Sequence, residues 1–180
     1  YGVYKWLNIN SLVYSFLSAH QNLIELKYFT SRVTNNPIKQ KRQSTYIEAL
    51  ETTGINVIYG LYKARDFECT NCGYTWQIPN EKMTDVNIAT HILIDAFNDK
   101  FDTAILISGD SDLVPPIKAV HKYFPDKSIS VWFPPNRHTN SVASAAKGSQ
   151  ILGRKTLSAN QFPEEVIKSD GFILKKPVGW

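Results

Sequence analysis

Two aspartates, Asp110 and Asp112, directly follow an apolar run in the stretch "TAILISGDSD", residues 103–112. Carboxylates at this spacing in a turn can point at one position, where they repel each other unless a proton or a cation lies between them. Hard divalent ions such as Mg²⁺ and Mn²⁺ prefer oxygen ligands of this kind. The pattern therefore predicts a Mg²⁺ or Mn²⁺ site. The alternative is a simple turn in which Asp112 caps the following helix.

A third acid, Asp85, opens a predicted helix over residues 84–99. In a parallel α/β fold, the helix that follows a strand starts at the carboxyl edge of the sheet, where ligands bind. The alternative is a first-turn aspartate that interacts favourably with the helix dipole. We predict that Asp85, Asp110 and Asp112 converge at this edge. Three other acids are mid-helix or at the opposite edge and are poorer candidates: Asp95, Asp99 and Asp102.

Predicted strands and helices alternate along the chain, and these elements must position the acids. Apolar runs predict strands over 23–30, 55–60, 103–108 and 128–133, and helical periodicity predicts helices over 9–20, 36–54, 84–99, 114–124 and 139–149. The run "TAILIS" lacks polar alternation, as expected for a strand covered on both faces. The alternation predicts an α/β fold with a central, mostly parallel sheet flanked by helices. Residues 1–180 are predicted to form one domain, with 150–180 as a weakly patterned C-terminal extension.

Residues 61–80 interrupt the alternation, because they lack helical periodicity and contain Cys69, Cys72 and Gly73. They are predicted to form a protruding hairpin or loop that is dispensable for the acids. The run "CTNCG" has the spacing of half a zinc site, but the sequence holds only these two cysteines. Two interpretations stay open: two reduced thiols in a tight hairpin, or zinc bound by pairing two chains in a homodimer. A redox role lacks the usual helix N-terminus.

Composition sets broad limits on function. The 180 residues are 43% hydrophobic and 20% charged, which is typical of one globular domain. The net charge of +4 permits a polyanionic partner without requiring one. No run is long enough to cross a bilayer, and the first residues show no signal-peptide pattern, so no membrane partner and a cytoplasmic location are expected.

The stretch "EKMTDVNIATHILIDAFNDKFDTAILISGDSDLVPPIKAV" (81–120) strongly resembles NYN domains, which are bacterial relatives of PIN-domain nucleases. The resemblance extends to "YKWLNINSL" (4–12) and "VWFPPNRHTNSVASAA" (131–146), and "TDV" combined with "SGDSD" is its most specific part. It implies a PIN-like fold whose acid cluster at the carboxyl edge binds Mg²⁺ or Mn²⁺ and cleaves RNA. Asp85, Asp110 and Asp112 match three acids of that cluster.

The sequence departs from the family pattern in two places. The family has a fourth acid in an Asp-Gly-x-Asn motif that ends a first strand, shortly before a Tyr-Gly pair. This chain begins at such a pair, so that strand and its acid are expected before Tyr1. His91 stands where many relatives carry an acid, and an ordinary helix histidine is the simpler interpretation.

These features leave two main hypotheses. The first is a metal-dependent endoribonuclease, in which Asp85, Asp110 and Asp112 hold one or two metal ions that activate water and stabilise the leaving oxygen. The second is a non-catalytic RNA-binding or regulatory module that retains the fold, and a different carboxylate–Mg²⁺ phosphotransfer enzyme is a third. For RNA binding, Arg32 and Lys82 are candidate phosphate contacts, and Thr30 and Ser108 are candidate polar supports.

Overall fold

The computed structural model describes residues 4–34 and 36–180, with the backbone alone at 62–65 and 77–81. Five strands pair in parallel within two sheets, of order β1-β2 and β5-β6-β7. Their bounds are β1 (Lys27–Thr30), β2 (Asn56–Tyr59), β5 (Thr103–Leu106), β6 (Ser128–Phe133) and β7 (Gly148–Ile151). Among the described residues, no strand pairs with both β1 and β5.

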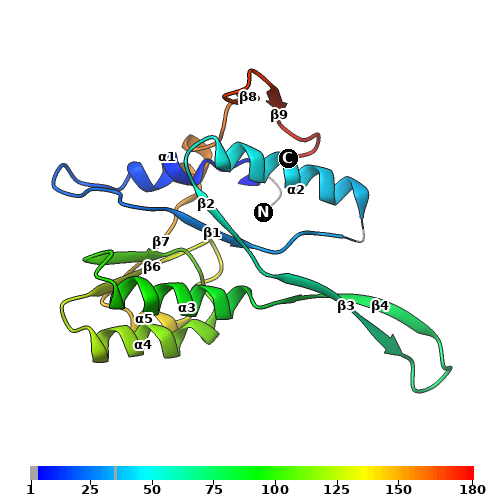
Figure 1. The fold of residues 1–180 in the computed structure, drawn as a ribbon, viewed down its shortest axis with the longest axis horizontal. Helices are drawn as coiled ribbons and strands as arrows, with labels where there is room; N and C mark the ends of the chain where they lie inside the picture. The colour runs from blue at the N-terminus through cyan, green and yellow to red at the C-terminus, as the bar shows by residue number, and fades with distance from the viewer. Residues whose placement is uncertain (1–3, 35) are drawn as a thin grey trace.

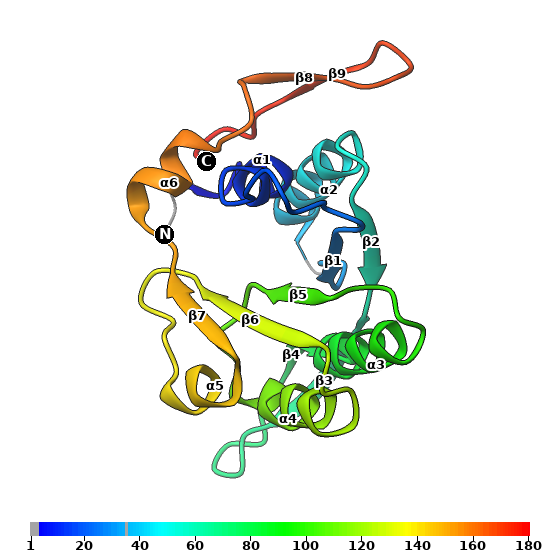
Figure 2. The ribbon, with the colours of Figure 1, turned by 90° about the vertical axis from the view of Figure 1, so that its left-hand side faces the viewer.

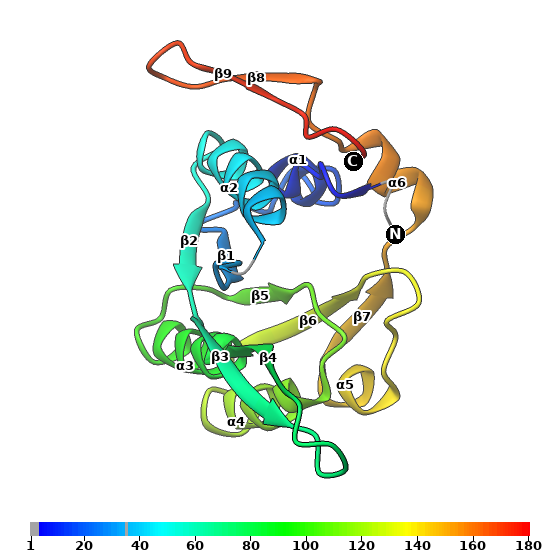
Figure 3. The ribbon, with the colours of Figure 1, turned by 90° about the vertical axis from the view of Figure 1, so that its right-hand side faces the viewer.

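Helices cover both sides of the parallel strands (Figures 2 and 3). Helices α1 and α2 lie above the strands in these views, and α3, α4 and α5 lie below them. The helices are α1 (Ile9–Tyr14), α2 (Pro37–Glu51), α3 (Thr84–Phe97), α4 (Val114–Tyr123), α5 (Asn140–Ala145) and α6 (Arg154–Ala159), with a 3₁₀ turn, η2 (Ser111–Leu113). The predicted α/β fold with a parallel sheet between helices is therefore confirmed.

Three apolar cores hold these layers together, and the third, around Leu12 and Trp132, joins α1 to β6. The lower core joins β6 to α4, where Ile117, Val120 and Phe133 are fully buried. The upper core gathers around Trp6, which contacts the rings of Tyr46 and Phe162. Phe162 belongs to the C-terminal residues 150–180, and a hairpin of β8 (Glu165–Ile167) and β9 (Ile173–Lys175) follows it. This weakly patterned segment therefore contributes buried side chains to the upper core.

The ends of α2 agree with the sequence-based prediction of a helix over 36–54. The Asn36 side chain accepts a hydrogen bond from the Lys39 N–H (2.9 Å), which caps the first turn, and Pro37 occupies the first helical position. Gly54 follows the helix with a φ of +80°, which glycine adopts without the strain that a side chain would bring.

Other predicted bounds were wrong. The helix predicted over 9–20 ends at Tyr14 and is capped by Asn8, and the strand predicted over 23–30 begins at Lys27. The helix predicted over 139–149 stops at Ala145, and Gly148–Ile151 instead forms β7, parallel to β6. This short polar strand has no alternation that a sequence could reveal. Pairing with β6 determines its conformation.

The segment predicted to protrude is a regular antiparallel hairpin of β3 (Leu61–Glu68) and β4 (Thr75–Lys82), and it projects from the body as an arm (Figure 1). Its two ends touch, since a Cβ added to Gly60 would lie 2.7 Å from the Thr84 Oγ1 and 2.8 Å from the Lys82 carbonyl oxygen. The arm therefore leaves and rejoins the body at one point, between β2 and α3.

Among the described residues, no helix is both long and apolar enough to cross a membrane.

Candidate functional site

The turn after β5 carries Asp110 and Asp112. The Asp110 N–H donates to the Ser108 Oγ (3.1 Å), and the Asp110 Oδ1 accepts from the Asp112 N–H (3.0 Å). Asp110 is thus the cap of η2, whereas the first turn of α4 has no side-chain cap, so the alternative in which Asp112 caps that helix is wrong. Both aspartates are exposed at the carboxyl end of β5. Ser108, predicted as a polar support, holds the backbone of this turn.

Gly109 lets a second loop pack on the same turn. A Cβ at this position would lie 2.0 Å from the carbonyl oxygen of Arg137, and the Thr139 Oγ1 donates to the Gly109 carbonyl (2.6 Å). Its φ is not positive, so the close approach of backbone, rather than a sharp turn, requires glycine here. The approach brings exposed Arg137 beside the acidic turn. We did not predict Arg137, although its place after the next parallel strand, β6, is a signal that could have identified it.

Asp85 lies in the first turn of α3, after Met83, whose φ is 73°. The Asn87 Nδ2 donates to the Tyr59 carbonyl (3.3 Å), which sets the start of α3 at the carboxyl end of β2. Helix α3 also packs against η2. The elements that carry Asp85, Asp110 and Asp112 therefore contact one another, and all three carboxylates are exposed.

The three acids are of the residue type that binds a hard cation, but their geometry is less suitable for one. Three carboxylates offer the oxygen donors that Mg²⁺ and Mn²⁺ prefer. Within residues 4–34 and 36–180, however, no three His, Cys, Asp or Glu side chains gather closely enough to hold a metal ion. A shared site of Asp85, Asp110 and Asp112 remains a prediction.

The other predicted substrate-binding residues have different surroundings. Thr30 is buried at the end of β1, where its Oγ1 accepts from the Gln43 Nε2 (3.4 Å). Lys82 is exposed at the end of β4, three residues before Asp85. Lys82 therefore borders the acidic edge, whereas Thr30 belongs to the packing between β1 and α2. The contact of either residue with RNA stays a prediction.

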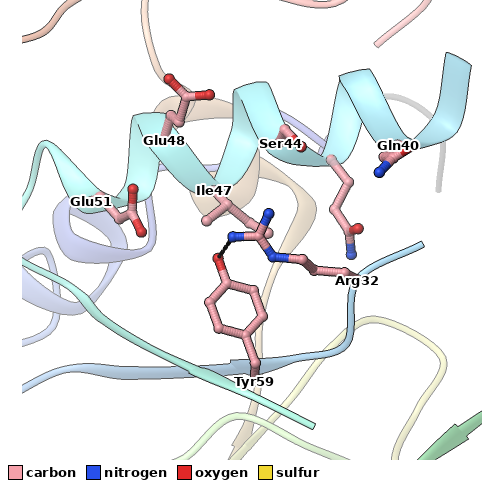
Figure 4. Close-up of a pocket in the computed structure, with 8 residues that line it drawn as sticks. Arg32, Gln40, Ser44, Ile47, Glu48, Glu51 and Tyr59 are labelled. Atoms are coloured by element: carbon pink, nitrogen blue, oxygen red, sulfur yellow. Dashed lines mark hydrogen bonds between the residues drawn. The ribbon is translucent and has the colours of Figure 1, made fainter. Parts of the chain in front are cut away.

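Arg32 extends beneath α2, into a cavity of about 120 Å³ (Figure 4). Its Nη2 donates to the Tyr59 Oη (3.1 Å), and its guanidinium lies 4.6 Å from the centre of the Tyr59 ring. Glu48 and Glu51 line the same cavity. Drug-sized ligands occupy pockets of about 300–1,000 Å³, so this cavity is too small for a nucleotide, and its acids disfavour phosphate.

The remaining polar groups of α3 have structural partners. His91 is half-buried against the Phe29 ring, with 5.5 Å between ring centres. Asp95 forms an ion pair with Lys27 on β1. Burial lowers the pKa of Lys27, but hydrogen bonds to Asp95 and Glu25 outweigh it, so the net pKa is raised. Asp99, which follows α3, pairs with Lys127. Asp95 and Asp99 thus each have an ion-pair partner in the fold.

Comparison with known proteins supports the same fold. A crystal structure of a protein of unknown function from Vibrio parahaemolyticus is similar to this chain, with a TM-score of 0.56 and 21% identity, covering 82% of this chain and 80% of that one. A comparison with curated proteins gives no match. The sequence matches the NYN domain over residues 5–151, which is most of the chain. The protein therefore belongs to the NYN domain family.

Proposed function

We propose that this protein is a metal-dependent ribonuclease that hydrolyses RNA phosphodiester bonds at the carboxyl edge of its parallel strands. NYN domains have a nuclease-like, RNA-related function, and the chain matches the domain over residues 5–151. The observation that carries the proposal is the exposed Asp110–Asp112 turn at the end of β5, which lies against the helix that begins with Asp85. Exposed carboxylates at a sheet edge offer the oxygen ligands that Mg²⁺ and Mn²⁺ prefer.

The residues have distinct roles in this proposal. The cap of η2 fixes the Asp110 carboxylate through Oδ1, so Oδ2 remains available to a cation. Asp112 and Asp85 supply further oxygen donors from η2 and α3. A bound Mg²⁺ or Mn²⁺ would neutralise the phosphodiester charge and lower the pKa of bound water. Arg137, beside the Gly109 turn, and Lys82, three residues before Asp85, are both exposed and can bind neighbouring phosphates.

The test compares full-length wild type with Asp110→Asn on labelled single-stranded RNA, in Mg²⁺, Mn²⁺ or chelator. Asparagine is as good a helix cap as aspartate, so the variant keeps the turn but loses the charge that would hold a cation. We expect cleavage to fall about a hundredfold or more, as when one preorganised electrostatic contact is removed. Asp126→Asn is the matched control, because Asp126 is an exposed acid just before β6, at the amino end of the strands.

Two results would contradict the proposal: undiminished cleavage by Asp110→Asn, or equal cleavage by wild type in chelator. If wild type binds RNA but cleaves none in either metal, the chain is instead a non-catalytic RNA-binding module. One observation favours that second candidate, since three potential metal ligands do not gather anywhere in the described part of the chain.

A further inference from the structure

The tip of the β3–β4 arm is a tightly bonded turn that holds Cys69 and Cys72. The Cys69 N–H donates to the Tyr74 carbonyl (2.8 Å), and the Gly73 N–H donates to the Cys69 carbonyl (2.9 Å). Gly73 has a φ of +70°, so a side chain there would strain the turn. The sequence "CTNCG" therefore specifies the conformation of this turn as well as the spacing of its two thiols.

The turn also keeps the two thiols close together. Cys69 opens the turn, Cys72 lies three residues further on, and both cysteines are free. Thiolate is the form of cysteine that binds zinc, and two thiolates from one C-x-x-C turn are half of a tetrahedral site.

The described residues of the same chain do not supply the missing half. In the part of the chain that the structure describes, no third His, Cys, Asp or Glu side chain joins a group that could hold a metal ion. The 180 residues contain no other cysteine. Structural zinc takes four ligands, so a second copy of this turn would complete a four-thiolate site.

The position of the tip permits this pairing. Figures 1 and 3 show the turn at the far end of the arm, well away from the rest of the chain, so two tips can meet without contact between the two bodies. Three aromatic side chains adjoin the cysteines. Phe67 and Trp76 pair across the strands with 4.9 Å between ring centres, and Tyr74 stacks on Trp76 at 6.1 Å.

These rings are exposed although they cluster: Tyr74 by 67%, Phe67 by 47% and Trp76 by 38%. Aromatic residues are enriched in protein interfaces, and an aromatic cluster in solvent is an apolar surface that association would bury. A metal site made by two tips would bring two such clusters together. The aromatic cluster is thus a second feature, independent of the thiols, that favours contact between two arms.

We propose that the arm is a zinc-dependent dimerisation device, in which Cys69 and Cys72 of two chains form one four-thiolate zinc site and the aromatic clusters pack beside it. On binding, four Zn–S bonds form and each thiol releases its proton to solvent, so no oxidant or reductant is needed. This dimerisation does not depend on the proposed ribonuclease activity.

The test uses the full-length protein, prepared with a reductant and without metal. Adding Zn²⁺ should convert monomer to dimer in analytical ultracentrifugation, with one zinc per two chains by elemental analysis. A chelator should restore the monomer. Cys69→Ser and Cys72→Ser should each remain monomeric in Zn²⁺, whereas Thr70→Ser, in the same turn, should dimerise like wild type. Unchanged thermal melting of the serine variants shows that the body is folded.

Several outcomes would overturn the proposal. These are one zinc per chain with no change in mass, a dimer that persists in chelator or in Cys69→Ser, or no zinc binding in the reduced protein. All are measured without RNA, so they are distinct from a failure of the proposed ribonuclease, which is tested by cleavage of RNA in Mg²⁺ or Mn²⁺.

Discussion

His121 connects α4 to the neighbouring elements of the lower core. Its Nε2 accepts from the Ile129 N–H (3.1 Å) on β6. Burial lowers the pKa of His121, the charge of Lys147 lowers it further, and a hydrogen bond to the Ala145 carbonyl only partly opposes them. The folded pKa therefore lies below the unfolded value of 6.5. The unfolded chain binds the proton first, so this contribution to stability is complete above about pH 6.5 and is lost as the pH falls through the folded pKa.

We predict that the melting temperature decreases from pH 7 to pH 5.5 more steeply in wild type than in His121→Leu. The variant has no titrating group here, and at pH 7 it should lose about 1–3 kcal/mol because the Ile129 N–H is left without its acceptor. Circular dichroism melts at constant ionic strength measure both effects. His20→Leu, at an exposed position, is the control and should follow wild type. Parallel pH curves for wild type and His121→Leu would refute the assignment.

At the scale of single residues, the sequence predicts some of the site residues but not others, and the difference has physical causes. The positions of Asp110 and Asp112 follow from the apolar strand that precedes them. The choice of cap does not, because Ser108, Asp110, Ser111 and Asp112 all offer side-chain oxygens within one turn. The only sequence signal for Arg137 is its place after β6, because it reaches the turn through the packing of its loop on Gly109.

At the scale of elements, periodicity predicts the long helices and buried strands, and it fails for short polar elements. Helices α2, α3 and α4 carry clear signals, including Pro37 and the prolines of the first turn of α4. Strands β7, β8 and β9 are three or four residues long, and β7 has no apolar face to reveal it. Each exists because a neighbouring strand offers hydrogen bonds, which is tertiary information.

The arm is an insertion whose removal should leave the body folded. Gly60 and the start of α3 are already in contact, and the main contacts of β3 and β4 are with each other. We predict that replacing residues 61–82 with Asn-Gly changes the free energy of unfolding by less than about 1 kcal/mol, because a shorter connection also costs less entropy to close.

Urea unfolding of the shortened chain measures this change, and ultracentrifugation in Zn²⁺ should show a monomer. A matched control replaces only Thr70 and Asn71 with Gly-Ser, which keeps the arm and both cysteines. If the shortened chain fails to fold, the arm supports the body in a way that its contacts do not reveal.

At the scale of the whole molecule, α3 links the two sheets. It packs on β1, where Asp95 pairs with Lys27, and it also packs on α4 and η2. Asp85 begins this helix beside β2, whereas Asp110 and Asp112 belong to the turn after β5. A cation shared by these acids would therefore bind between the β1–β2 side and the β5–β7 side of the fold. Its binding would stabilise the molecule as a whole.

Thermal melting with and without Mn²⁺ tests this coupling in the Cys69→Ser, Cys72→Ser background, which excludes the thiols of the arm. A ligand present at a hundred times its Kd adds about 2.7 kcal/mol to the stability of the folded state. For a chain of this size the melting temperature should rise by about 5–10 °C. Asp85→Asn and Asp110→Asn should each lose most of this rise, whereas Asp126→Asn should keep it.

In chelator, both site variants should melt at or above the temperature of the parent, because each removes a carboxylate that repels its neighbours. An equal rise in Asp110→Asn would place the ion elsewhere, and a rise lost in Asp110→Asn but kept in Asp85→Asn would show that the ion binds the η2 turn without joining the two sides.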